Sequence, residues 1–238
     1  MNNLQGIIRK SVNNTYAQFD KLGYIGNNFA NYTTTGYKSV RFEQMLAEDG
    51  SLTGVVRTNY DQGSIQVTGN PYDVAISGSG FIPVTSPTGE VQYTRDGSFK
   101  LNKEGYLITN DNWLVGGGIQ IPSNAYKITI KEDGRITSMD SAKSPEKTIG
   151  TIPLVQFKNP EGLKQGENNK LIATADSGDA KLIKDHNYIK QNSLENSNTN
   201  IYASVSDMLR LNASMIASLR MAKIIDDMYN KSISLRDS

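Results

Sequence analysis

Residues 4–29, LQGIIRKSVNNTYAQFDKLGYIGNNF, place an apolar side chain at every third or fourth position. This spacing follows one face of a helix and predicts an amphipathic α-helix over residues 1–31. Polar residues crowd the stripe, and Gly6, Gly23 and Gly26 each cost roughly 0.5–1 kcal/mol relative to alanine in a helix interior. We therefore expect this helix to need a partner. The stripe residues expected to contact that partner are Leu4, Ile8, Val12, Phe19, Leu22 and Phe29.

The other end of the chain has the same periodicity, which predicts an amphipathic helix within residues 191–238. Ser197, Asn198 and Thr199 precede the periodic run and are candidates for its N-cap. Two such stripes suit a coiled coil with each other and with copies from neighbouring chains. The alternative is two helices packed onto one globular core, because an amphipathic stripe names no partner by itself. The expected contacts on this helix are Val205, Met208, Ile216, Leu219 and Ile225.

Between the two helices the apolar pattern changes from the helical period to alternation. Short runs such as Val74–Ile76, Val91–Thr94 and Ile128–Ile130 follow one another with turn signals between them. This pattern predicts a central antiparallel β-domain over residues 65–190, and residues 32–64 fit neither pattern and are expected to form an extended connector. The predicted fold class is therefore α+β, with the terminal helices forming a coiled-coil-like α-domain.

The composition excludes several kinds of chemistry. The chain has no cysteine, which removes disulfides, thiolate metal sites and cysteine nucleophiles. Its single histidine, His186, lies in a polar run and is expected to be a solvated loop residue. Lys plus Arg number 25 against 24 Asp plus Glu, so the net charge of +1 provides no field to attract nucleic acid. No catalytic residue, metal site or cofactor is therefore predicted.

Two local patterns could suggest a ligand, but each has a structural explanation. Gly78-Ser79-Gly80 and Gly116-Gly117-Gly118 could form phosphate-binding loops, but neither completes a nucleotide-binding motif or precedes a helical pattern. Aspartates could supply the paired carboxylates of a glycoside hydrolase, yet most of them lie in turns, where aspartate bonds locally. These aspartates are Asp73, Asp96, Asp111 and Asp133.

The sequence shows no sign of membrane insertion. Its first ten residues lack the apolar core of a secretory signal, and no segment approaches the ~18 consecutive apolar residues of a membrane span. If the chain leaves the cytoplasm, we expect it to do so without a cleaved signal peptide.

Several ordered motifs resemble those of the bacterial flagellar rod and hook proteins. The segment 27–38, NNFANYTTTGYK, resembles the family's N-terminal signature, and 73–81 and 93–99, DVAISGSGF and YTRDGSF, resemble two central blocks. The segment 194–200, LENSNTN, resembles the block that precedes the family's C-terminal helix. One departure is ASLRM at 217–221, where the family pattern differs. The motif residues singled out are Asn27, Asn28, Ala30, Asn31, Gly36, Tyr37, Lys38, Tyr93, Thr94, Arg95, Asp96 and Gly97.

This resemblance implies a structural subunit that polymerises through its terminal helices into a helical tube and transmits torque. Its implied partners are further copies of itself, other rod and hook subunits and the flagellar type III export apparatus, and its implied place is the rod of the basal body. A short turn between Leu46 and Gly54, where distal rod proteins commonly carry an insertion, favours the proximal-rod type over the distal rod. The alternative from another class is a surface-binding or carbohydrate-binding β-domain whose terminal helices are linkers.

Overall fold

The computed structural model describes residues 2–46, 52–184 and 187–234, so His186 lies outside the described residues. The chain divides into two compact units. We call them the helical unit, which comprises Met1–Asn31, Ser39–Asn59 and Thr199–Ser238, and the β-unit, which comprises Tyr32–Lys38 and Tyr60–Asn198. The predicted α+β class, with terminal helices in contact and central antiparallel sheets, is confirmed.

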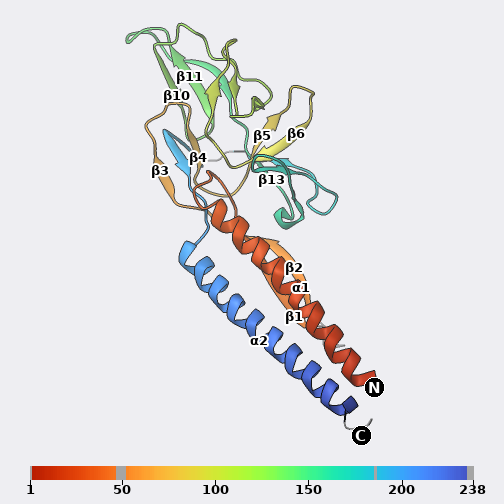
Figure 1. The fold of residues 1–238 in the computed structure, drawn as a ribbon. Helices are drawn as coiled ribbons and strands as arrows, with labels where there is room; N and C mark the ends of the chain where they lie inside the picture. The colour runs from red at the N-terminus through yellow and green to blue at the C-terminus, as the bar shows by residue number, and fades with distance from the viewer. Residues whose placement is uncertain (1, 47–51, 185–186, 235–238) are drawn as a thin grey trace. The chain divides into compact units, whose positions relative to one another are not determined.

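The helical unit is built on two long helices, α1 (Asn2–Ala30) and α2 (Ile201–Ser234). They run side by side in opposite directions, so that the two chain ends lie at the same end of the pair (Figure 1). The N-cap of α2 is Asn200, whose Oδ1 accepts a hydrogen bond of 3.0 Å from the backbone N–H of Ala203. The prediction of an N-cap at 197–199 was wrong, because Asn200 directly precedes the first helical turn.

A β-hairpin belongs to the same unit. Strands β1 (Val40–Leu46) and β2 (Leu52–Thr58) pair in antiparallel register, with Phe42 opposite Val56. The expectation of an extended connector over 32–64 was therefore wrong for this part. A two-stranded hairpin is marginal on its own, and α1 supports it: the rings of Tyr24 and Phe42 stack with centroids 5.6 Å apart.

The β-unit consists of small antiparallel sheets. The largest has seven strands and ends on the two-residue strands β14 (Lys164–Gln165) and β7 (Lys100–Leu101). Between these two edges lie, in order, β15 (Lys170–Ile172), β6 (Val91–Thr94), β5 (Ile82–Thr85), β9 (Leu114–Val115) and β8 (Leu107–Ile108).

The remaining strands of the β-unit form a three-stranded sheet and several pairs. Strand β18 (Ser193–Glu195) pairs with β3 (Ile65–Val67), so residues 193–195 belong to a sheet and not to the helix predicted within 191–238. The other pairs are β4 (Val74–Ile76) with β17 (Ile189–Gln191) and β13 (Val155–Gln156) with β16 (Lys181–Leu182). The three-stranded sheet consists of β10 (Lys127–Ile130), β11 (Arg135–Met139) and β12 (Lys147–Thr151). A short 3-10 helix spans Pro160–Gly162.

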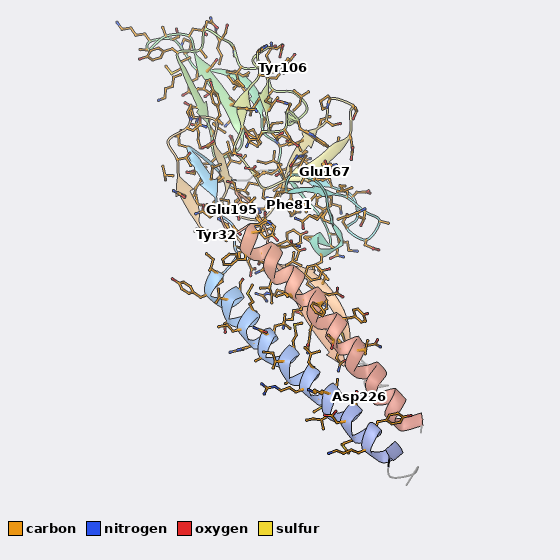
Figure 2. All side chains as sticks on the ribbon, viewed as in Figure 1. Tyr32, Phe81, Tyr106, Glu167, Glu195 and Asp226 are labelled. Carbon is orange, nitrogen blue, oxygen red and sulfur yellow. The ribbon has the colours of Figure 1, made fainter. Side chains whose placement is uncertain are left out.

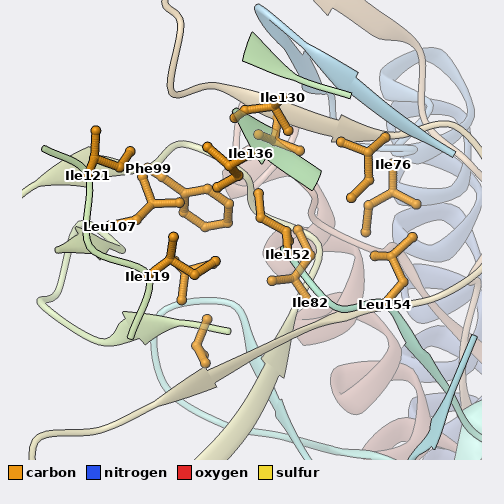
Figure 3. Packing of buried hydrophobic residues seen from close by; sticks show 14 residues of the cluster. Ile76, Ile82, Phe99, Leu107, Ile119, Ile121, Ile130, Ile136, Ile152 and Leu154 are labelled. Carbon is orange, nitrogen blue, oxygen red and sulfur yellow. The ribbon is translucent and has the colours of Figure 1, made fainter. Parts of the chain in front are cut away.

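The main core of the β-unit is aliphatic. Ile76, Ile82, Ile136, Ile152 and Leu154 are completely buried and pack together with the ring of Phe99 nearby in the same cluster (Figure 3). Fully burying one such side chain contributes about 1.5–3 kcal/mol. This unit therefore contains the apolar core that the two helices lack.

Candidate assembly surface and the motif residues

The helical unit carries an open apolar groove of about 290 Å³ between α1 and α2. Its walls leave large side chains in contact with solvent: Phe19 is 53% exposed and Leu219 is 60% exposed. Contiguous apolar surface of this kind marks an interaction site in a soluble protein. The groove is lined by Val12, Thr15, Tyr16, Phe19, Ser218, Leu219, Ala222 and Ile225.

The structure places the predicted contact residues in three groups. Val12, Phe19, Leu219 and Ile225 line the groove. Phe29, Val205, Met208 and Ile216 are exposed elsewhere on the two helices, and Leu22 is half-buried. Leu4 and Ile8 belong to α1, but their side chains lie outside the described residues. The sequence analysis did not predict that Thr15 and Ser218 line the groove. Only their position beside the apolar stripe could have indicated it.

Among the side chains that the structure describes, α1 and α2 bury few large apolar residues. The buried residues that these helices contribute are small or polar for the most part, and Gln18 Nε2 donates a hydrogen bond of 3.0 Å to Ser214 Oγ. The larger apolar residues among them are Ile25 and Leu211. Most helical stability in proteins comes from packing of an apolar face, so this pair needs more surface than it covers by itself. The buried set is Ala17, Gln18, Ile25, Asn28, Ser204 and Leu211.

The first family motif begins at the end of α1, where the Asn28 side chain bonds the first strand of the hairpin. The Asn28 side chain donates to the carbonyl of Val40 over 2.7 Å and accepts from its N–H over 2.8 Å. Two hydrogen bonds from one amide mimic a strand partner and fix the start of β1. The amide of Asn31 donates to the carbonyl of Asn27, which closes the last turn of α1.

Three motif residues far apart in the sequence meet in a buried ionic cluster in the β-unit. Glu195 Oε1 accepts hydrogen bonds from Lys38 Nζ at 2.7 Å and from the Gly63 N–H at 2.9 Å. Glu195 Oε2 accepts from Arg95 Nε at 2.8 Å. The Glu195 side chain is fully buried, and those of Lys38 and Arg95 are nearly so. Burial, with a further contribution from the Arg95 charge, lowers the pKa of Lys38 although Glu195 opposes this effect.

The guanidinium of Arg95 also bonds the backbone of a neighbouring motif. Its NH1 donates to the Gly80 carbonyl at 2.9 Å, and its NH2 donates to the carbonyls of Gly78 and Ile76 at 2.9 and 3.2 Å. The glycine-rich run therefore presents carbonyls to a cation, which excludes the anion-binding loop considered from the sequence.

Two motif glycines lie where no side chain fits. A Cβ on Gly97 would be 1.7 Å from the Val74 carbonyl oxygen. Gly36 has φ of +67°, and its Cβ would approach the Arg95 carbonyl carbon to 2.6 Å. Gly36 lies beyond the end of α1 at Ala30 and serves this close approach.

The remaining central motif residues hold the turn after β6. Asp96 Oδ1 accepts hydrogen bonds from the N–H and hydroxyl of Ser98, and Thr94 Oγ1 accepts from the Asp96 N–H. Burial raises the pKa of Asp96 despite those bonds. The ring of Tyr93 meets that of Phe157 edge to face with centroids 4.8 Å apart. The predicted turn role of Asp96 is thus confirmed.

A polar cleft of about 620 Å³ is the best candidate in the β-unit for the carbohydrate-binding alternative. Lys170 Nζ lies 4.7 Å from the centroid of the Trp113 ring and pairs with Asp111. The lysine therefore occupies one face of the Trp113 indole, which is then not open for a sugar to stack on. Burial alone would raise the pKa of Asp111, but hydrogen bonds from Lys170, Thr109 and Asn168 together hold it below its usual value.

Neither a metal site nor a membrane span is found in the part of the chain that the structure describes. Among those residues, no group of three or more His, Cys, Asp or Glu side chains could hold a metal ion. No helix within the described ranges is both long and apolar enough to cross a bilayer.

Comparison with known proteins agrees with the motif geometry. The family model for the flagellar hook protein FlgE/F/G D1 domain matches residues 75–138. The flagellar basal-body rod protein FlgG of Caulobacter vibrioides is 35% identical over 201 residues, which cover 74% of this chain and 76% of that protein. FlgG of Bacillus subtilis is 27% identical over 91% of this chain and 93% of its own length. FlgF of Caulobacter vibrioides is 38% identical over 62% of this chain and 65% of its own. The chain therefore belongs to the flagellar basal-body rod proteins, and it is a structural subunit of the rod and not an enzyme.

Proposed function

We propose that this subunit builds the distal rod, as the relatives named FlgG do, and that it polymerises through α1 and α2 into a helical tube that transmits torque. The observation that carries the proposal is the exposed apolar groove of the helical unit. Side chains such as Phe19 and Leu219 gain the most from burial, and a neighbouring copy with the same stripes supplies the missing apolar surface. Contacts between copies that do not close into a ring propagate as a filament.

The extent of the matches supports the distal position over the proximal one. FlgG relatives align over as much as 91% of this chain, whereas the FlgF relative aligns over 62%. The argument for the proximal rod rested on the short turn between Leu46 and Gly54. Residues 47–51 of that stretch lie outside the described residues, and the strands that flank them, β1 and β2, pair with each other.

We further propose that the subunit is exported by the flagellar type III apparatus with its helices unfolded, and that they become ordered on assembly against copies of itself and other rod and hook subunits. Helices that bury little surface alone cannot offset the entropy of ordering. The absence of disulfides keeps the chain threadable. Circular dichroism tests this: helix content should be low in a dilute monomer and rise on polymerisation. Full helicity in the dilute monomer would contradict the proposal.

The position in the rod can be tested on isolated basal bodies. An epitope inserted in the exposed turn at Ser141–Ser144 of the β-unit would be located by electron microscopy in native basal bodies. Labelling of the half of the rod nearer the hook supports the distal assignment. Labelling confined to the half nearer the cytoplasmic membrane would reverse it in favour of the proximal rod.

A further inference from the structure

Glu195 bonds segments that flank every passage of the chain between the two units. These passages fall after residues 31, 38, 59 and 198. The backbone oxygen of Glu195 accepts from the Gly36 N–H at 2.7 Å, and its carboxylate accepts from Lys38 and from the Gly63 N–H. Figure 2 labels this residue in the β-unit. A single residue thus joins the segments 32–38, 60–63 and 195–198.

Further hydrogen bonds fix these segments in one register. The Asn198 N–H donates to the Tyr37 carbonyl at 3.3 Å, and the Asn198 side chain donates to the Asp61 carbonyl at 2.8 Å. Lys38 Nζ donates to the same Asp61 carbonyl at 2.7 Å. The segment that follows α1 therefore cannot slide past the segment that precedes α2 without breaking several bonds. We call Glu195, Lys38 and Asn198, with the backbone groups that they bond, the register clamp.

The interface between α1 and α2 is poorly suited to set its own register. Among the described side chains, the buried residues of the two helices are mostly small or polar, such as Ala17 and Ser204, and few are large enough to specify one register. Helix α2 carries exposed apolar residues at many positions, so a slip by one turn, about 5.4 Å, replaces one apolar contact by another. In the observed register, the groove is lined by Phe19 of α1 and by Leu219 and Ile225 of α2.

We infer that the register clamp aligns α1 with α2 and that Glu195 is its positioning residue. Only residues 31–35 separate α1 from Gly36, and only 199–200 separate Asn198 from α2, so along the chain the clamp lies close to the end of α1 and to the start of α2. Buried ionic groups are weak as a source of net stability, and their best-attested use is to fix register. Arg95 anchors the second oxygen of Glu195 to the strands of the β-unit. This inference rests on the proposed assembly through the helices.

Cross-linking in assembled filaments tests the register directly, because the chain has no cysteine of its own. Gln18→Cys with Ser214→Cys reports the observed register, since these two side chains are in contact. Gln18→Cys with Ser218→Cys reports a slip of one turn. With a short bis-thiosulfonate reagent, we expect the first pair to react at least tenfold faster than the second. In Glu195→Gln filaments the two rates should become similar, whereas Glu104→Gln, at an exposed carboxylate, should leave the ratio unchanged.

A second experiment applies if the Glu195→Gln protein does not assemble. If bridging positions 18 and 214 restores its filaments, register was the missing property and the inference stands. If near-ultraviolet circular dichroism shows a folded β-unit but the bridge restores nothing, the inference is overturned. Should Glu195→Gln unfold the β-unit, Asn198→Ala replaces it, because that variant keeps the buried charges and should shift the ratio in the same direction.

The failure of this inference differs from the failure of the proposed function. If neither Glu195→Gln nor Asn198→Ala changes the cross-linking ratio of the filaments, the clamp is contradicted. Assembly through the helices is then left intact. A wild-type protein that forms no filaments, or forms them with both helices deleted, contradicts the proposed function and the clamp with it.

Discussion

Lys38 Nζ lies 2.7 Å from Glu195 Oε1 although 157 positions separate the two residues. Removing one partner of a buried pair leaves the other charge uncompensated, which typically costs about 3–5 kcal/mol. We therefore expect Lys38→Met to lower the free energy of unfolding of the β-unit by about this amount in urea titrations. Lys103→Met, at an exposed position, is the matched control and should change it little. Equal stability of both variants would show that the pair contributes nothing.

Gly97 offers a test of close packing against the backbone. In Gly97→Ala the new methyl group would meet the Val74 carbonyl oxygen, so strand β4 must shift. Overpacking of this kind costs about 1–3 kcal/mol and sometimes more. We expect a lower thermal midpoint of the β-unit by calorimetry. Gly26→Ala is the control: its Cβ meets nothing within 4 Å, and it should leave that midpoint unchanged while raising helix propensity by about 1 kcal/mol.

The groove can be tested by placing the same charge at one of two exposed positions of α1, one of which lines the groove while the other does not. Phe19→Asp removes an apolar contact that is worth about 1.5–3 kcal/mol when buried, so we expect the critical concentration for polymerisation to rise at least tenfold. Asn13→Asp adds the same charge at an exposed residue that does not line the groove. Sedimentation of filaments against subunit concentration gives both values. Equal effects of the two substitutions would exclude the groove as the contact surface.

The pairing of Asp111 with Lys170 predicts how acid affects the β-unit. The pKa of Asp111 is below its usual 3.8 in the folded protein. Its contribution to stability is therefore complete above that value and is lost as the pH falls through the lower, folded pKa. Lys170→Met keeps the contact with Trp113 but removes the charge, so the pKa of Asp111 should rise and this acid-dependent loss should shrink.

Carboxyl NMR titration of Asp111 in the wild type and in Lys170→Met measures that change. Lys164→Met, on the same cleft but exposed, should leave the pKa of Asp111 where it is. A pKa that does not respond to Lys170→Met would mean that the bonds from Thr109 and Asn168 suffice.

Periodicity predicted both helices and several strands of the β-unit because those signals are local. Val91–Thr94 and Val74–Ile76 were recognised as strands from residues within a few positions of each other. The hairpin was missed because its stability depends on α1, through the Tyr24–Phe42 stack, and a two-stranded sheet has little pattern of its own.

The ionic cluster could not be predicted for the same reason. Its members come from three motifs, with Arg95 and Glu195 100 positions apart, and no spacing rule joins them. The resemblance covered all three residues, with Glu195 in the block 194–200, but only the fold shows Glu195 as the common partner of Lys38 and Arg95. The exposed apolar positions of the helices could be predicted, because apolar residues at helical spacing are visible in a sequence, and their contact with other copies stays a prediction.

The seven-stranded sheet has one last consequence, which follows from its borders. Both outermost strands, β7 and β14, are two residues long and each contains a lysine. Edge strands that are this short and carry a lysine offer almost no template for hydrogen bonding to a strand of another molecule. These borders thereby protect the seven-stranded sheet of concentrated subunits from amyloid-like growth.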